Sequence, residues 1–168
     1  AGLFLPPTAP SYETRVTSPE NSPPPDSAND QGLTRAITAA RVAAETRGND
    51  LVVLDLRKLT PVFDYFVIAT GTSRRQIHAM ADEIEMVLKQ QFGDLARGSE
   101  GYEEGRWIVL DYGDVVVHLL DAEARDFWDL EGLWSDARRV ALPDSIPQRE
   151  IAQMTAGEAG EQLPASPE

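Results

Sequence analysis

The sequence predicts an α/β fold in which a mixed β-sheet is flanked by helices. Apolar runs typical of buried strands alternate with segments that have helical apolar spacing, and a hairpin pattern follows at residues 107–120. Strands that alternate with helices and then form a hairpin are typical of a mixed sheet covered by helices.

Only the middle of the 168-residue chain carries these patterns. Residues 1–33 are rich in Pro, Ser and Asn, and residues 143–168 are rich in Ala, Glu, Gln and Pro. Neither stretch has enough periodic apolar residues to offset the entropy cost of ordering it, so both are predicted to be disordered tails. Residues 34–142 are predicted to form one domain, which is the number expected for this length.

The predicted domain opens with a helix and two strands. Thr34 is the predicted helix cap, and Gly48 supplies the stop. The helical spacing is carried by Ala36, Ile37, Ala40, Ala43 and Ala44. Residues 51–56 are predicted to form a buried strand, and residues 65–69 form a second strand after a break at Pro61.

The next segment has the clearest helical pattern in the chain. Ser73 and Gln76 have the spacing of a capping box, and Phe92-Gly93 is the predicted end. One face carries Ile77, Met80, Ala81, Ile84, Val87 and Leu88. A weak strand is predicted near residues 95–97.

A hairpin and a last helix complete the domain. Residues 107–111 and 114–120 flank Tyr112-Gly113, which is predicted to be a two-residue turn. This register pairs Trp107 with His118. Residues 125–140 are predicted to form one helix with an apolar stripe of Phe127, Leu130 and Trp134.

The hairpin register separates two faces. The core face carries Ile108, Leu110, Val115, Val117 and Leu119. The other face carries Trp107, Val109, Asp111, Asp114, Val116 and His118. Two interpretations of this second face stay open. A helix covers it, or it is a binding patch with Trp107 as an aromatic anchor and Glu100, Glu103 and Glu104 nearby.

Composition excludes several classes of function. The formal net charge of −13 disfavours direct nucleic-acid binding, because phosphate contacts need Lys and Arg. There are no cysteines and only two histidines, so no metal site or other cofactor is expected. No apolar run is long enough to span a membrane, and the first residues lack the basic flank of a signal peptide. We expect a cytoplasmic protein.

Two features suggest catalytic or anion-binding chemistry. Gly71, Thr72, Ser73 and Arg74 lie at a strand-to-helix turn that could hold an anion, although the pattern favours Thr72 and Ser73 as caps of the helix. Asp64, Asp111 and Asp114 are candidates for a metal or acid–base site, but aspartates beside a turn are commonly solvated.

Five segments taken together resemble the ribosomal silencing factor (RsfS or Iojap) family. They are DYFVIATGTSRRQ (64–76), ADEIE (81–85), EGY (100–102), WIVLDYGDVVVH (107–118) and FWDLEGLW (127–134). The resemblance implies a topology related to the nucleotidyltransferase fold without its catalytic acids. It also implies a non-enzymatic repressor that binds the large ribosomal subunit through its ribosomal protein number fourteen. Bound there, the repressor would block joining of the small subunit.

The family's partner-contacting tryptophan matches Trp107. The predicted partner-binding residues are therefore Trp107, Glu100, Asp111, Tyr112, Asp114 and His118. The chain departs from the family pattern at Ser99 and at Gly132, which lies inside the predicted last helix. The alternatives are a nucleotidyltransferase-like enzyme that uses the turn at Gly71 and the aspartates, and a homodimer that pairs through the Trp107 face.

Overall fold

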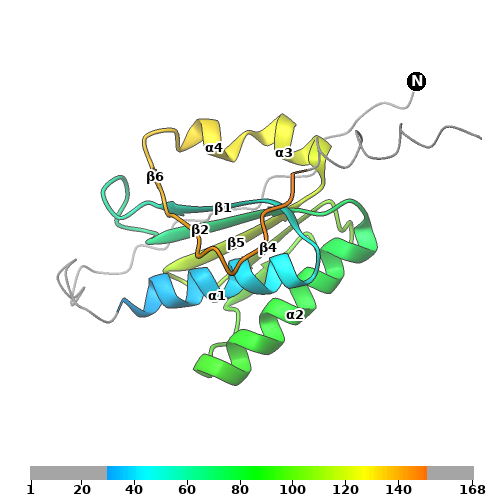
Figure 1. The fold of residues 1–168 in the computed structure, drawn as a ribbon, viewed down its shortest axis with the longest axis horizontal. Helices are drawn as coiled ribbons and strands as arrows, with labels where there is room; N and C mark the ends of the chain where they lie inside the picture. The colour runs from blue at the N-terminus through cyan, green and yellow to red at the C-terminus, as the bar shows by residue number, and fades with distance from the viewer. Residues whose placement is uncertain (1–29, 151–168) are drawn as a thin grey trace, which may run out of the picture.

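A computed structural model describes residues 30–150, in which six strands form one mixed sheet in the order β3-β4-β5-β2-β1-β6. β2 and β5 are parallel, and the other neighbouring strands are antiparallel (Figure 1). The strands are β1 (Asn49–Asp55), β2 (Tyr65–Thr70), β3 (Gly98–Glu100), β4 (Trp107–Asp111), β5 (Val115–Leu120) and β6 (Arg138–Arg139). The predicted α/β class with a mixed sheet is confirmed.

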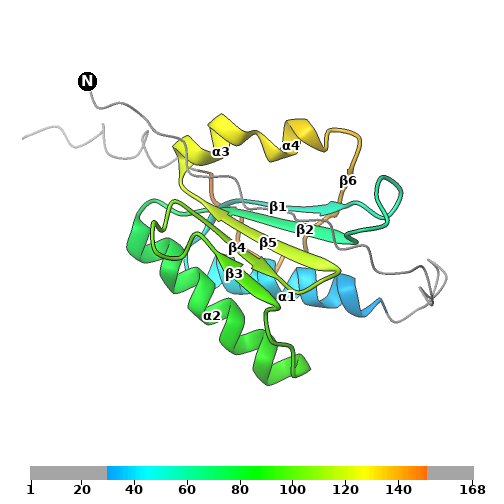
Figure 2. The same ribbon diagram turned by 180° about the vertical axis from the view of Figure 1, so that it is seen from behind.

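Helices cover both faces of the sheet. The long helices α1 (Gln31–Glu45) and α2 (Arg74–Phe92) lie on one face, and the short helices α3 (Ala122–Trp128) and α4 (Leu130–Leu133) lie on the other (Figures 1 and 2). Each face has its own apolar cluster. All residues of β2 and β5 are buried, which explains why both strands are almost continuously apolar in sequence.

Helix α1 begins at Gln31, before the predicted cap. Asp30 is the N-cap, and its carboxylate accepts a hydrogen bond of 3.0 Å from the Leu33 N–H. The Thr34 hydroxyl instead donates to the Asp30 carbonyl at 3.1 Å. The predicted cap at Thr34 is therefore wrong, because an aspartate with the right geometry precedes it by one turn.

Helix α2 has both predicted ends. The Ser73 hydroxyl accepts from the Gln76 N–H at 3.1 Å, and Gly93 closes the helix with a left-handed φ of 69°. The predicted stripe faces the sheet, with Ile77, Met80, Ala81, Ile84 and Leu88 buried.

The hairpin turn lies one residue later than predicted. Trp107 pairs with Leu120 and Asp111 with Val116, and the Tyr112 N–H donates to the Val115 carbonyl at 2.9 Å. The turn residues are Gly113 and Asp114, with the positive φ of 94° at Gly113. The predicted pairing of Trp107 with His118 is wrong. The pairing moves by two residues, so each strand keeps its predicted faces.

The predicted last helix is two short helices followed by β6. Asp129 adopts a left-handed φ of 41°, which ends α3, and its carboxylate then caps α4 by accepting from the Gly132 N–H at 3.1 Å. A side chain at residue 132 would collide with that carboxylate, which explains the glycine. The predicted apolar stripe is wrong for Phe127, which is 54% exposed.

Two shorter segments also differ from prediction. The third strand is Gly98–Glu100, three residues beyond the predicted weak strand. Residues 143–150, predicted to belong to the disordered tail, pack on the domain. Ile146 is buried, and the Arg149 carbonyl accepts from the Asp50 N–H at 2.7 Å. Residues 1–29 and 151–168, the rest of the predicted tails, lie outside the described residues.

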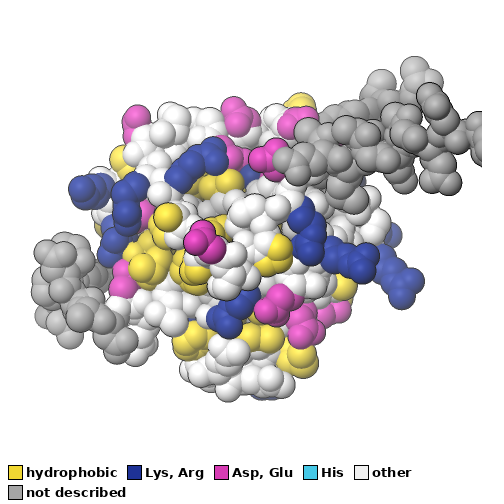
Figure 3. Space-filling model, viewed as in Figure 1, with side chains coloured by type: hydrophobic (Ala, Val, Ile, Leu, Met, Phe, Trp, Pro, Cys, Tyr) yellow, Lys and Arg dark blue, Asp and Glu magenta, His cyan; other side chains and the backbone are white. Residues whose placement is uncertain are grey.

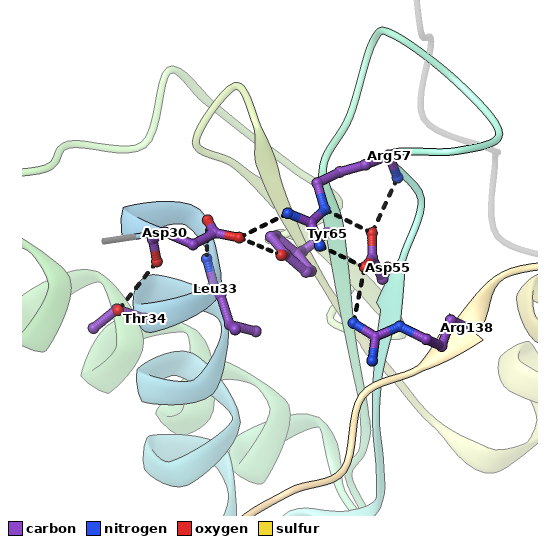
Figure 4. Close-up of polar contacts among 7 residues, drawn as sticks. All are labelled: Asp30, Leu33, Thr34, Asp55, Arg57, Tyr65 and Arg138. Atoms are coloured by element: carbon purple, nitrogen blue, oxygen red, sulfur yellow. Dashed lines mark hydrogen bonds and ion pairs between the residues drawn. The ribbon is translucent and has the colours of Figure 1, made fainter. Parts of the chain in front are cut away.

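A polar cluster around Arg57 joins four elements (Figure 4). The Arg57 guanidinium donates to both oxygens of Asp55 at 2.9 and 2.8 Å and to Asp30 at 3.0 Å. The Tyr65 hydroxyl donates to Asp30 at 2.5 Å, and Arg138 reaches Asp55 at 3.1 Å. Charge-assisted bonds thereby connect the start of α1, the end of β1, the start of β2 and β6.

This cluster predicts an acid-dependent part of the stability. Hydrogen bonds from Arg57 lower the pKa of Asp55 from its ordinary 3.8 to about 2. The folded-state pKa is depressed, so the contribution is complete above about pH 4 and is lost as the pH falls towards 2. Asp55→Asn should lower the free energy of unfolding at pH 7 by about 2 kcal/mol. Urea unfolding measures this, with Glu104→Gln as the exposed control. Equal stability of Asp55→Asn and the parent chain at pH 7 would contradict the prediction.

Candidate functional site

Trp107, the residue with the strongest predicted role, is buried. It opens β4, and its side chain lies on the face covered by α3 and α4, where it is 5% exposed. Its indole N–H donates to Nδ1 of His118 at 3.2 Å. The two side chains that were predicted to be cross-strand partners are therefore in contact, although their backbones are offset in the register.

His118 is fully enclosed. Burial lowers the pKa of His118 from its ordinary 6.5 to about 3, so its ring is neutral near pH 7. Because Nδ1 accepts from Trp107, the ring proton resides on Nε2, which has no hydrogen-bond partner among the described residues. The Phe66 ring packs edge-on against His118 with 4.6 Å between centroids.

Helix α3 covers this pair. Trp128 packs on Trp107 with 5.5 Å between ring centroids. Arg125 fastens α3 to the sheet, since its guanidinium donates to the Asp50 carbonyl at 2.5 Å and to the Thr70 hydroxyl at 2.7 Å. Of the two interpretations left open for this face, the geometry favours a face covered by helices.

The other predicted binding residues lie in three different places. Asp111 accepts from the Gly113 N–H at 2.7 Å within the hairpin turn. The Asp114 carboxylate is paired with Arg35 of α1. Tyr112 lies on the opposite face of the sheet, in the cluster under α1 and α2, and burial raises the pKa of its hydroxyl. Glu100 on β3 is the one exposed residue of the predicted six.

Glu100 belongs to an acidic surface at the β3 edge of the sheet. We define the β3 edge surface as Glu100 of β3, Tyr102 of the following loop, and Asp82 and Glu85 of α2. Glu100 pairs with Val109, so its side chain points to the α3 and α4 side of the sheet, whereas the α2 carboxylates lie on the other side. The Tyr102 hydroxyl donates to Asp82 at 2.7 Å, which raises the pKa of Tyr102. Burial and the charge of Asp82 raise the pKa of Glu85. Tyr102 is 41% exposed.

The loop that carries Tyr102 is tied to α2. The His78 ring contacts the Arg74 carbonyl at 2.8 Å and the Tyr102 carbonyl at 2.5 Å. Its ring also packs edge-on against that of Tyr102. Sequence reasoning placed acids near this edge but missed the α2 residues. Asp82 and Glu85 are three residues apart, a helical spacing that is equally typical of an ordinary solvated face.

The predicted anion-binding turn uses several of its donors internally. Gln76 Oε1 accepts from the N–H and the hydroxyl of Thr72 at 2.7 and 2.9 Å, and Ser73 caps α2. The Gly71 N–H donates to a β5 carbonyl at 2.9 Å. The Arg74 guanidinium donates to a carbonyl of the loop before β4. These bonds favour the capping interpretation, and anion binding stays a prediction.

The candidate metal or acid–base aspartates gain no support from the geometry. Asp111 and Asp114 are engaged as described above, and Asp64 is half-buried with a pKa raised by burial and by the charge of Asp114. Within residues 30–150, no group of three His or acidic side chains is placed to hold a metal ion.

The distribution of surface charge and the apolar character of the helices bear on which partners the domain can bind. On the face seen in Figure 3, Lys and Arg side chains are interspersed with Asp and Glu side chains, so this face is not the uniformly basic surface that phosphate contacts need. None of the helices in the described part of the chain is both long and apolar enough to cross a membrane.

Comparison with known proteins gives a consistent result. The sequence model of the family described as "Ribosomal silencing factor during starvation" matches residues 28–165, which includes every described helix and strand. The chain is 42% identical over 96 residues to the ribosomal silencing factor RsfS of Chromobacterium violaceum, covering 57% of this chain and 78% of the relative. It is 38% identical over 110 residues to RsfS of Bacillus subtilis, covering 66% and 92%.

A more distant relative and two solved structures extend the comparison. The mouse protein named "Mitochondrial assembly of ribosomal large subunit protein 1" is 32% identical over 93 residues, covering 54% of this chain and 41% of the relative. A crystal structure of a Chromobacterium violaceum protein superposes with a TM-score of 0.60 at 35% identity, covering 68% and 94% of the two chains. One from Bacillus halodurans gives 0.57 at 33% identity, covering 68% and 100%.

The buried histidine predicts a second, separate pH dependence. The folded-state pKa of His118 lies below its ordinary 6.5, so the unfolded chain binds the proton first and stability falls as the pH drops below 6.5. Between pH 7.5 and pH 5 this should cost about 2 kcal/mol in urea unfolding. His118→Gln should lose that dependence. If the parent chain and His118→Gln respond equally to pH, His118 is not held neutral by burial.

Proposed function

Because the chain belongs to the ribosomal silencing factor family, we propose that it represses translation by binding the large ribosomal subunit and blocking its joining with the small subunit. The observation that carries this proposal is the family match over residues 28–165. The names of the bacterial relatives support silencing. The name of the mouse relative supports a further effect on assembly of the large subunit.

The proposed mechanism is steric and needs no catalysis. A domain with both sheet faces covered by helices is not easily deformed. When it is bound to the large subunit at the surface that contacts the small subunit, it sterically excludes the small subunit. The formal charge of −13 disfavours contacts with ribosomal RNA and favours a basic protein surface. The proposed partner is therefore ribosomal protein number fourteen of the large subunit, as the family resemblance implies.

The predicted binding residues take different parts in this proposal. Glu100 contacts the partner directly, because it is exposed on β3. Asp111 and Asp114 shape the adjoining hairpin turn. Trp107 and His118 act as positioning residues that hold β4 against α3 from inside the domain.

Co-sedimentation tests the proposal directly. The purified chain should pellet with isolated large subunits and not with small subunits. When small subunits are then added, the pre-bound chain should reduce the fraction of joined ribosomes on a sucrose gradient, in proportion to occupancy. A chain that pellets with neither subunit, or one that binds large subunits without reducing joining, contradicts the proposed function.

Trp107 has a matched control in the same aromatic cluster. Trp107→Ala should weaken binding to large subunits by roughly tenfold, because loss of its contacts with His118 and Trp128 loosens β4 behind the binding surface, and mutations remote from a ligand change coupling by about 0.5–2 kcal/mol. Trp134→Ala removes a tryptophan that packs on Phe66, with 5.8 Å between ring centroids, near the other end of this cover. Both variants should lose stability, by about 3 kcal/mol. If the affinity for large subunits falls equally in Trp107→Ala and Trp134→Ala, Trp107 contributes to folding and has no specific role in binding.

A further inference from the structure

One edge of the sheet is covered by a following segment of the chain, and the other edge is open. At the β1 edge, β6 and the following segment cover the strand, with the Val140 N–H bonded to the Val53 carbonyl at 2.8 Å and the Asp50 N–H to the Arg149 carbonyl at 2.7 Å. At the other edge, β3 ends the strand order within residues 30–150, and all its residues are exposed. Unpaired N–H and C=O groups at such an edge are a template for another strand.

Several side chains beside this open edge are acidic or apolar, and the guanidinium of Arg97, which precedes β3, lies against Gly113 of the hairpin turn. Asp82 and Tyr102 are joined by a hydrogen bond of 2.7 Å, and Glu85 lies close enough to Asp82 for the two charges to disfavour one another. Leu95, between α2 and β3, is 67% exposed. Exposed apolar side chains beside carboxylates suit a segment with both apolar and cationic side chains.

The edge is also held in place before any partner arrives. The loop after β3 is fixed to α2 by the two contacts of His78 and by the Arg74 guanidinium. Gly105 adopts a left-handed φ of 64° in this loop, and a side chain there would meet His78 at 2.5 Å. A surface that is already ordered loses little conformational entropy on binding.

We propose that the open edge of β3 accepts an extended segment bearing Lys or Arg side chains from the partner, which adds to the sheet as a further strand. This rests on the proposed function, since the segment would belong to the large-subunit protein. Main-chain hydrogen bonds supply the affinity, and the β3 edge surface selects cationic and apolar side chains. A second copy of this chain is a poor occupant, because the acidic side chains of its own β3 edge surface would lie against those of the first copy.

Hydrogen–deuterium exchange on the full chain tests strand addition. On binding to isolated large subunits, those amides of Gly98–Glu100 that point away from β4 should exchange at least tenfold more slowly, whereas a contact through side chains alone would leave them unchanged. Co-sedimentation without this protection overturns the inference and leaves the proposed function standing. Light scattering of the free chain tests whether a second copy occupies the edge. A dimer with protected β3 amides would also overturn the inference.

An experiment with a synthetic peptide distinguishes failure of the strand-addition proposal from failure of the proposed function. A synthetic peptide of alternating Lys and Val residues, added to the chain without ribosomes, should protect the same β3 amides. Protection by the peptide combined with no binding to large subunits would support the edge and contradict the proposed function. No protection by either the peptide or the subunits overturns the inference.

Charge reversal tests the chemistry of the occupant. Glu100→Lys combined with Asp82→Lys should weaken binding to large subunits by roughly tenfold at low salt, and less at high salt. The control pair, Asp136→Lys with Asp144→Lys, makes the same change in net charge beyond α4 and β6, near the covered β1 edge. The affinity of this control variant for large subunits should stay within about twofold of that of the parent chain. Equal weakening by both pairs would show a general charge effect and overturn the assignment of this edge.

Discussion

β2 and β5 pair in parallel at the centre of the sheet, and every residue of both strands is buried. A short turn cannot join parallel strands, so the chain must leave β2 and return through a long connection. That connection contains α2, β3 and β4. It places α2 on one face and puts β3 at the outside of the sheet. Because the other face of this pair is also apolar, α3 and α4 must cover it.

This two-sided burial decides which side chains can meet a partner. Trp107 and His118 point to the second face, so the cover of α3 and α4 encloses them. Their contact then contributes to the internal order of the sheet, with Trp107 donating to a histidine that burial keeps neutral. The surface left for recognition is the margin of the sheet. There β3 is short and exposed, and Asp82 of α2 bonds to Tyr102 in the loop that follows it.

The sequence patterns that predicted correctly were local ones. Ser73, Gln76 and Gly93 determine the ends of α2 through contacts within a few residues. The hairpin faces were correct for a similar reason, since side-chain alternation survives a shift of two residues. The hairpin pairing, the start of α1 and the single last helix were wrong. Each depended on a choice between neighbouring candidates, such as Asp30 against Thr34, or on the left-handed backbone of Asp129.

The sequence by itself determined the fold class, the family and the acidic character of the domain, because apolar period, capping residues and charge are properties of the chain read in order. Only the tertiary structure decided that Trp107 is enclosed and that Glu100 is exposed. It also decided that Asp82 of α2 lies against Tyr102 in the loop after β3. Residue spacing specifies which face of a strand a side chain occupies, but what covers that face depends on elements distant in sequence.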